Sequence, residues 1–177
     1  MGELLRQIQE QVGSTGEKGW PVAVKDRVAF AAGKDCKFCE AQVAVTFLWT
    51  MRDVVIPRLE KQNLAIAANF YTPAGIAGMV RNLLANPFIR YMIILGNEYA
   101  CNSPNNAGLQ QLTSANALRV FFQKGITEDR KVQGFETAVY FDKNIPTELI
   151  QKVAESVELI DLNSQMPESS LDEKIAK

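Results

Sequence analysis

Residues 86–98 read NPFIRYMIILGNE, and this stretch decides the fold. Asn86-Pro87 is typical of a helix end, because proline cannot continue a helix and restricts the residue before it. Ile89–Leu95 is an apolar, β-branched run that predicts a buried strand. Gly96, Asn97 and Glu98 then form a polar strand end. In an open α/β sheet a ligand normally binds at the carboxyl end of such a strand, so we expect a site there.

Strand and helix patterns alternate on both sides of this stretch. Apolar, β-branched runs predict strands at 42–49, 63–70 and 157–162, with an extended segment at 132–140. Apolar spacing and turn residues predict helices at 52–61, where Pro57 causes a kink or a late start, and at 72–86, 109–124 and 145–156. This alternation predicts an α/β fold: a Rossmann-like single domain with a mainly parallel sheet of about five strands and flanking helices.

The two ends of the chain differ from this alternating part. Apolar residues recur at helical spacing from Leu4 to Val12, so residues 1–19 are expected to form a short helix and a loop. A small edge strand or hairpin is expected at 22–30, at the start of the α/β domain that covers residues 20–162. Residues 163–177 are a polar, acidic tail that we expect to fray.

Composition limits the possible functions. A chain of 177 residues, 47% of them hydrophobic, is long enough for one substantial core. The formal net charge of −1 provides no basic surface, so we expect no nucleic-acid partner. Residues 1–6 contain no basic segment followed by an apolar run, and no window is apolar enough to cross a bilayer. We therefore expect a cytoplasmic protein without a signal peptide or membrane contact.

Histidine is absent from the sequence, which excludes Ser-His-Asp and Cys-His catalysis and imidazole metal ligands. The three cysteines are Cys36, Cys39 and Cys101. The C-x-x-C spacing of the first two suits part of a zinc site, part of an iron–sulfur cluster, or a redox pair. The motif precedes a predicted strand, however, whereas a thioredoxin-like pair follows one. Reduced thiols without a ligand are the alternative.

An amide-rich segment with almost no charge follows the central strand. It includes Gly96, Asn97, Glu98, Asn102 and Ser103. Neutral amides can hydrogen-bond a large ligand without the cost of desolvating fixed charges. Turn-forming residues in a solvated loop explain the same letters, so both interpretations stay open.

A second group, Asn69, Tyr71, Thr72 and Gly75, lies at the end of the preceding predicted strand. An anion or a carbonyl group can bind at the start of the helix expected there. Ordinary capping of that helix by Thr72 is the alternative. Glu98 is a single carboxylate beside a strand end, and one acid alone is a weak indication of acid–base chemistry.

A family resemblance centres on residues 86–98. The pattern Asn86-Pro87-x-Ile89-Arg90-Tyr91-x-Ile93-x-Leu95-Gly96-x-Glu98 resembles the A subunit of tetrahydromethanopterin S-methyltransferase, in its soluble corrinoid-binding domain. The resemblance extends over about residues 20–162, through Trp20-Pro21-Val22, Val43-Ala44-Val45-Thr46, Gly134 with Asn144-Ile145-Pro146, and Val157–Leu162. Segments 69–76 and 81–87 look closer to soluble relatives joined to thymidylate-synthase-like domains.

The resemblance implies a Rossmann-like fold and a role in methyl transfer. In the family a cobamide, a cobalamin-type corrinoid, carries a methyl group on cobalt between a methylated pterin and a thiol. A histidine shortly after Gly-x-Glu is its lower axial ligand, and the corresponding place here is near Asn102. The resemblance thus implies a corrinoid-binding or methyl-carrier-like module in pterin-linked one-carbon metabolism that lacks this histidine. Its main wall is expected from Gly96, Asn97, Glu98, Asn102 and Ser103, and its facing wall from Tyr71 and Thr72.

Partners and alternatives follow from the same resemblance. A partner methyltransferase protein, or a second copy of the chain, is expected to hold the methyl donor and acceptor, so the module itself need not be catalytic. One alternative is a cofactor-free interaction or regulatory subunit on the same fold. Another is a metal or redox protein that holds zinc or an iron–sulfur cluster with Cys36, Cys39 and Cys101.

Overall fold

A computed structural model describes residues 34–35, 41–86, 88–98, 113–135 and 139–177. The N-terminal helix expected at 4–12 and the hairpin expected at 22–30 lie outside these ranges. Within them the prediction of an α/β fold with a mainly parallel sheet is confirmed.

The sheet has the strand order β1-β3-β2-β4-β5. Its strands are β1 (Lys34–Asp35), β2 (Val43–Thr46), β3 (Ile66–Ala68), β4 (Tyr91–Ile94) and β5 (Glu158–Asp161). Strands β3, β2, β4 and β5 are parallel, and two-residue β1 pairs antiparallel with β3 at one edge. The expected count of about five strands is therefore reached only with this short edge strand, and the parallel part has four.

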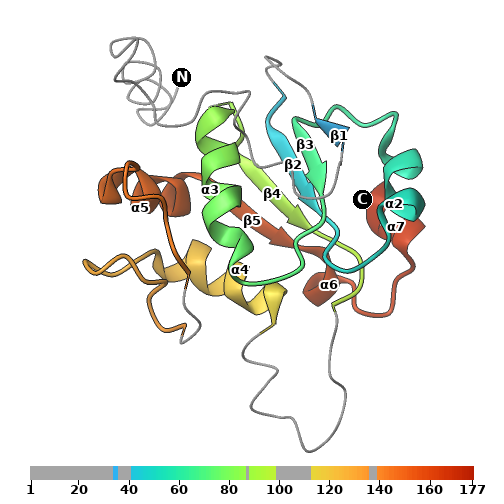
Figure 1. Cartoon of the computed structure of the whole chain (residues 1–177). Coiled ribbons are helices and arrows are strands. Elements are labelled where there is room, and N and C mark those ends of the chain that lie inside the picture. Colours follow the sequence, from blue (N-terminus) through green and yellow to red (C-terminus); the bar gives the residue numbers. More distant parts are fainter. Residues whose placement is uncertain (1–33, 36–40, 87, 99–112, 136–138) are drawn as a thin grey trace, which may run out of the picture.

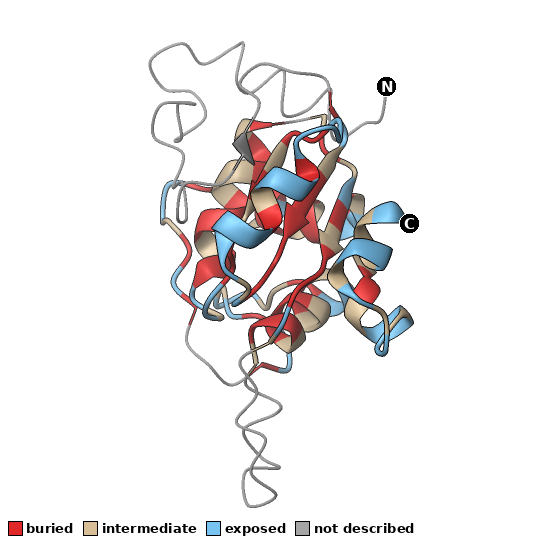
Figure 2. Cartoon of the chain, turned by 90° about the vertical axis from the view of Figure 1, so that its right-hand side faces the viewer, coloured by how far each residue is buried: buried red, intermediate tan, exposed pale blue. Residues whose placement is uncertain are grey.

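Helices cover both faces of the sheet (Figure 1). One face carries α3 (Gly75–Ala85), α4 (Ser114–Lys124) and α5 (Thr147–Ser156). The other carries α2 (Arg52–Leu59) and α7 (Leu171–Ala176), while the short α6 (Leu162–Gln165) directly follows β5. Figure 2 shows that α2 and α7 turn exposed surfaces outward.

Alternation along the strands produces two cores. In β2, Ala44 belongs to the larger cluster under α3, α4 and α5, and Val45 belongs to the smaller cluster under α2. In β4, Ile94 faces the larger cluster and Ile93 the smaller one. Successive side chains of a strand point to opposite faces, so two short apolar strands hold both helical layers.

Residues 86–98 fold much as their sequence predicts. Helix α3 ends at Ala85, and the backbone N–H of Asn86 donates to the carbonyl of Leu83. Strand β4 covers Tyr91–Ile94, the middle of the predicted strand. Gly96 follows with a φ of 82°, a left-handed conformation that ends the strand.

Three boundary predictions are wrong. Helix α3 begins at Gly75, because Thr72 and Pro73 form a turn whose carbonyls accept from Gly75 and Ile76, and the helix has no side-chain cap. Strand β2 stops at Thr46, since Leu48 takes a φ of 46°. Of the segment expected to be extended at 132–140, Val132 forms only an isolated bridge with Ile126, and a turn at Gly134 follows.

The segment expected to fray at 163–177 contains helical turns instead. Asp161 caps α6 by accepting from the backbone N–H of Ser164. Ser170 and Glu173 form a capping box at the start of α7. Leu171 and Ile175, one helical turn apart, pack against the smaller core cluster. The composition is polar, but these two apolar residues, together with the ion pair between Asp172 and Arg58 of α2, dock the helix.

Candidate site at the carboxyl edge of the sheet

The four parallel strands bring their following loops to one edge of the sheet. We call this the carboxyl edge, and it comprises residues 47–51 after β2, 69–72 after β3, 95–98 after β4, and residues 161–164, which run from the last residue of β5 into α6. Open α/β sheets normally bind ligands at this edge. The described residues expected to form the two walls of the site, which are Tyr71, Thr72, Gly96, Asn97 and Glu98, all belong to it.

A tight turn at Gly96 joins the loops after β4 and β2. A Cβ atom at Gly96 would lie 2.5 Å from the carbonyl oxygen of Phe47 and 2.6 Å from Thr50 Oγ1. The backbone N–H of Asn97 donates to Thr50 Oγ1 at 2.7 Å, and that of Trp49 donates to the carbonyl of Asn97 at 3.0 Å. Gly96 is therefore a residue that the close approach of two backbones requires.

The side chains of Asn69 and Asn163 also donate hydrogen bonds to these loops. Asn69 is only 2% exposed, and its Nδ2 donates to the carbonyls of Leu48 at 2.7 Å and Thr50 at 2.8 Å. Asn163 donates from Nδ2 to the carbonyl of Gly96 at 2.6 Å and accepts from Lys174 Nζ at 3.1 Å. The loops after β2, β4 and β5 are thus one hydrogen-bonded unit that reaches α7.

Glu98 has a structural partner. Its Oε2 accepts from the backbone N–H of Ala115 at 2.7 Å, in the first turn of α4. A carboxylate at a helix N-terminus satisfies a free N–H group and interacts favourably with the helix dipole. Ser114, in the same turn, donates to the carbonyl of Tyr71 at 2.8 Å. Glu98 thus helps to position α4 against the edge.

An ion pair between Asp161 and Arg119 connects the end of β5 to α4. Asp161, only 8% exposed, lies with Oδ2 at 2.5 Å from Arg119 Nε of α4, and it also accepts from the hydroxyl of Ser164 at 2.8 Å. Burial raises the pKa of Asp161, but the hydrogen bonds from Ser164 and Arg119 outweigh it and hold the pKa below its usual value. Sequence reasoning missed this pair, because 42 residues separate its members.

The exposed part of the carboxyl edge is aromatic. The rings of Trp49 and Tyr71 meet edge to face with centroids 4.9 Å apart, and the residues are 41% and 37% exposed. Met51, 67% exposed, lies two residues after Trp49. We call Trp49 and Tyr71 the aromatic pair. Tyr71 was predicted for the site, whereas Trp49 was placed at the end of a buried strand, and only the early end of β2 leaves it exposed.

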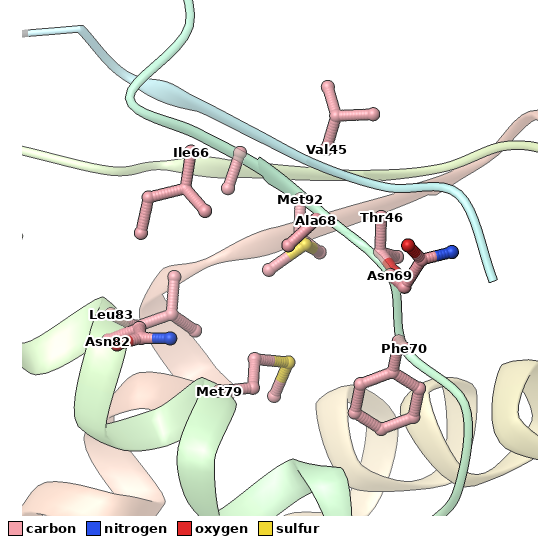
Figure 3. A pocket seen from close by; sticks show the side chains of 11 residues that line it. Val45, Thr46, Ile66, Ala68, Asn69, Phe70, Met79, Asn82, Leu83 and Met92 are labelled. Atoms are coloured by element: carbon pink, nitrogen blue, oxygen red, sulfur yellow. The ribbon is translucent and has the colours of Figure 1, made fainter. Parts of the chain in front are cut away.

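Three cavities that are lined by described residues lie beside this edge. The first, about 40 Å³, lies between the sheet and α3, as Figure 3 shows. A second, about 480 Å³, lies on the opposite face of the sheet among Val43, Leu64, Ile93, Ile160 and Ile175. A third, about 720 Å³, runs along β5 beside Arg119, Phe122 and Glu158. None of these three is lined by Tyr71, Thr72, Gly96, Asn97 or Glu98.

Several predicted residues lie outside the described ranges. They are Asn102 and Ser103 of the expected main wall and all three cysteines, Cys36, Cys39 and Cys101. Within the ranges that are described, no three His, Cys, Asp or Glu side chains are grouped as metal ligands. No helix in those same ranges is long and apolar enough to cross a membrane.

Known proteins similar to this chain share one description. The family model for the A subunit of tetrahydromethanopterin S-methyltransferase matches residues 15–177. One such A subunit, numbered 1, from Methanothermobacter thermautotrophicus is 29% identical over 148 residues, which is 82% of this chain and 53% of the relative. The A subunit from Methanosphaera stadtmanae is 26% identical over 161 residues, 89% of this chain and 56% of the relative.

The alignment covers only part of these relatives, which limits what can be inferred about this chain from their function. The chain spans about half the length of the curated relatives it matches. The family model, in contrast, covers β1 to α7 without interruption, including the whole carboxyl edge. The chain therefore belongs to the family of tetrahydromethanopterin S-methyltransferase A subunits.

Proposed function

We propose that the chain is a corrinoid-binding, methyl-carrier-like module of pterin-linked one-carbon metabolism. The observation that carries the proposal is the aromatic pair, exposed at the edge where open α/β sheets bind ligands. The names of its relatives, S-methyltransferases of tetrahydromethanopterin, support the reaction class. The chain spans about half the length of these relatives, and we propose that a partner methyltransferase protein takes part in the rest of the reaction.

The residues present suit the corrin ring of a corrinoid better than its cobalt atom. Trp49 and Tyr71 offer broad apolar rings, and the exposed side-chain amide of Asn97 can hydrogen-bond the amide groups around a corrin. The donor set for cobalt does not fit in the same way, because the chain contains no histidine and asparagine occupies position 102. We therefore infer that the protein holds the macrocycle by its edge and face, without an imidazole ligand.

A bound corrinoid supplies a cobalt atom that can accept and release a methyl group. The chain itself orients the ring with Trp49 and Tyr71, while Gly96 and Glu98 keep the supporting loops and α4 in place. Asn102 and Ser103 are proposed as further contacts. Because the described edge is an open surface, a partner methyltransferase protein is proposed to bind the methyl donor and acceptor.

A cobamide titration followed by its absorption spectrum tests this function. We expect saturable binding by the wild-type chain and a spectrum typical of cobalt without a protein imidazole. Asn102→His should strengthen binding and shift the spectrum, since neutral imidazole is a good cobalt ligand. Absence of binding by the wild-type chain would contradict the proposal, and an unchanged spectrum for Asn102→His would contradict the placement of position 102.

A cofactor-free interaction or regulatory subunit is the second candidate. The same exposed Trp49, Tyr71 and Met51 favour it, because aromatic and methionine side chains are enriched in protein interfaces. A colourless protein with no measurable cobamide affinity, whose binding to the partner methyltransferase protein is weakened by Trp49→Ala, would support this role.

A further inference from the structure

The small cavity between the sheet and α3 is polar at one end. Thr46, the last residue of β2, and Asn69, just after β3, line this end (Figure 3). Apolar side chains line most of the remainder, with Met92 from the sheet and Met79 from α3. The cavity is connected to the loop that carries Trp49, because Asn69, which lines the cavity, donates hydrogen bonds to that loop.

The side-chain amide of Asn69 can adopt only one orientation. Its Nδ2 lies 2.7 Å from the carbonyl oxygen of Leu48 and 2.8 Å from that of Thr50. Both neighbours are acceptors, so a donor must face them and the amide cannot be flipped. The Oδ1 atom consequently points away from the loop. It is buried, and no group among the described residues donates a hydrogen bond to it.

The hydroxyl of Thr46 is in the same situation. Thr46 is 6% exposed, and its Oγ1 is buried without a hydrogen-bond partner in the described part of the chain. Buried polar atoms in native proteins are nearly always paired with protein groups or with ordered water. Two such atoms at one end of one cavity therefore point to a ligand that can bond to both.

We propose that this cavity binds ordered water, with one molecule hydrogen-bonded to both Asn69 Oδ1 and Thr46 Oγ1. Water can donate to the amide oxygen and also donate to or accept from the hydroxyl. A volume of about 40 Å³ holds a few water molecules, since each needs at least about 10–15 Å³. It is far below the roughly 300 Å³ of the smallest usual small-molecule sites, so the cavity suits water better than an organic ligand.

The bound water has a consequence for the carboxyl edge. Asn69 connects the water to the backbone of Leu48 and Thr50, which flank Trp49. The water thus supports the loop of the aromatic pair. This inference holds whether or not the edge binds a corrinoid.

A crystal structure of the full chain at a resolution that shows ordered water tests the site directly. We expect a water molecule within hydrogen-bond distance of both Asn69 Oδ1 and Thr46 Oγ1. A cavity without density, or an Asn69 amide whose oxygen faces Leu48, would overturn the proposal.

Thr46→Val tests the same claim in solution, because valine keeps the shape of threonine and removes only the hydroxyl. We expect the Tm to fall by about 2–4 °C, and exchange of the Trp49 and Thr50 amide hydrogens to accelerate at least threefold. Thr72→Val, at an exposed threonine, is the control and should change neither quantity. An unchanged or higher Tm for Thr46→Val would show that the hydroxyl has no partner and would overturn the proposal.

Discussion

The carboxyl edge of the sheet consists of two layers of residues with opposite roles. The inner layer, defined here as Asn69, Gly96, Glu98, Asp161 and Asn163, makes the hydrogen bonds and close contacts that join four loops and α4. The outer layer, defined as Trp49, Tyr71, Thr72 and Asn97, exposes its side chains. Polar residues after a strand are thus not all ligand contacts. Gly96 and Glu98, which are expected to bind a ligand, also make the contacts that build the edge.

The contrast between the layers predicts large stability effects for the inner one and small effects for the outer one. Gly96→Ala should have the largest effect. Its Cβ would meet the carbonyl oxygen of Phe47 at 2.5 Å, at a φ of 82°. We expect the free energy of unfolding to fall by about 2–4 kcal/mol, measured by urea denaturation. A change below about 0.5 kcal/mol, which is typical of surface sites, would contradict the proposed close contact.

Asp161 should give the edge a pH dependence. Because its pKa is lowered in the folded protein, the carboxylate stabilises the fold above its unfolded-state pKa of about 4. This contribution is lost as the pH falls through the lower folded-state pKa. We expect Asp161→Asn to lower the free energy of unfolding at pH 7 by about 1–2 kcal/mol, because the pair with Arg119 is partly exposed.

Unfolding measured between pH 7 and pH 2 checks this expectation. The wild-type protein and Asp161→Asn should converge at acidic pH. A constant difference between the two curves over the whole range would mean that the charge of Asp161 does not stabilise the fold.

Glu98 should have a smaller effect. Glu98→Ala removes the acceptor for the N–H of Ala115 and should lower the free energy of unfolding by about 1 kcal/mol. Glu98→Gln keeps an acceptor oxygen and should cost less. Glu148→Gln is a matched control, since Glu148 lies in the first turn of α5 and is exposed. If Glu98→Ala and Glu148→Gln have equal effects, the hydrogen bond from Ala115 to Glu98 does not stabilise the fold.

The order of strands and helices was predictable because it depends on local patterns. The runs at 43–46 and 91–94 are mainly apolar and rich in β-branched residues, and Asn86-Pro87 and Gly125 mark helix ends where helices do end. The roles of Gly96 and Glu98 were not predictable, because their partners are distant in sequence. The contact between Gly96 and Phe47 exists only after β2 and β4 have paired.

Trp49, one member of the aromatic pair, was missed for a related reason. Trp49 extends the apolar run of β2, so the sequence predicts that it ends a buried strand. The left-handed conformation of Leu48 ends the strand early and exposes the indole. No local pattern predicts that conformation, because leucine rarely adopts a positive φ.

The outer layer should have the smallest effect on stability and the largest on ligand binding. Trp49→Ala combined with Tyr71→Ala is expected to change the free energy of unfolding by less than about 1 kcal/mol, since both side chains are partly exposed. Tyr91→Ala is the matched control. Tyr91 is 38% exposed, like Tyr71, but it is the first residue of β4. It therefore lies at the amino end of the strand, away from the carboxyl edge.

The most direct test of the central claim is the dissociation constant of cobamide for these three proteins, measured by absorption titration. We predict that the wild type and Tyr91→Ala bind with the same affinity and that the Trp49→Ala, Tyr71→Ala double variant binds at least tenfold more weakly. Equal affinity of all three proteins would contradict the account, as would a wild-type chain that does not bind cobamide.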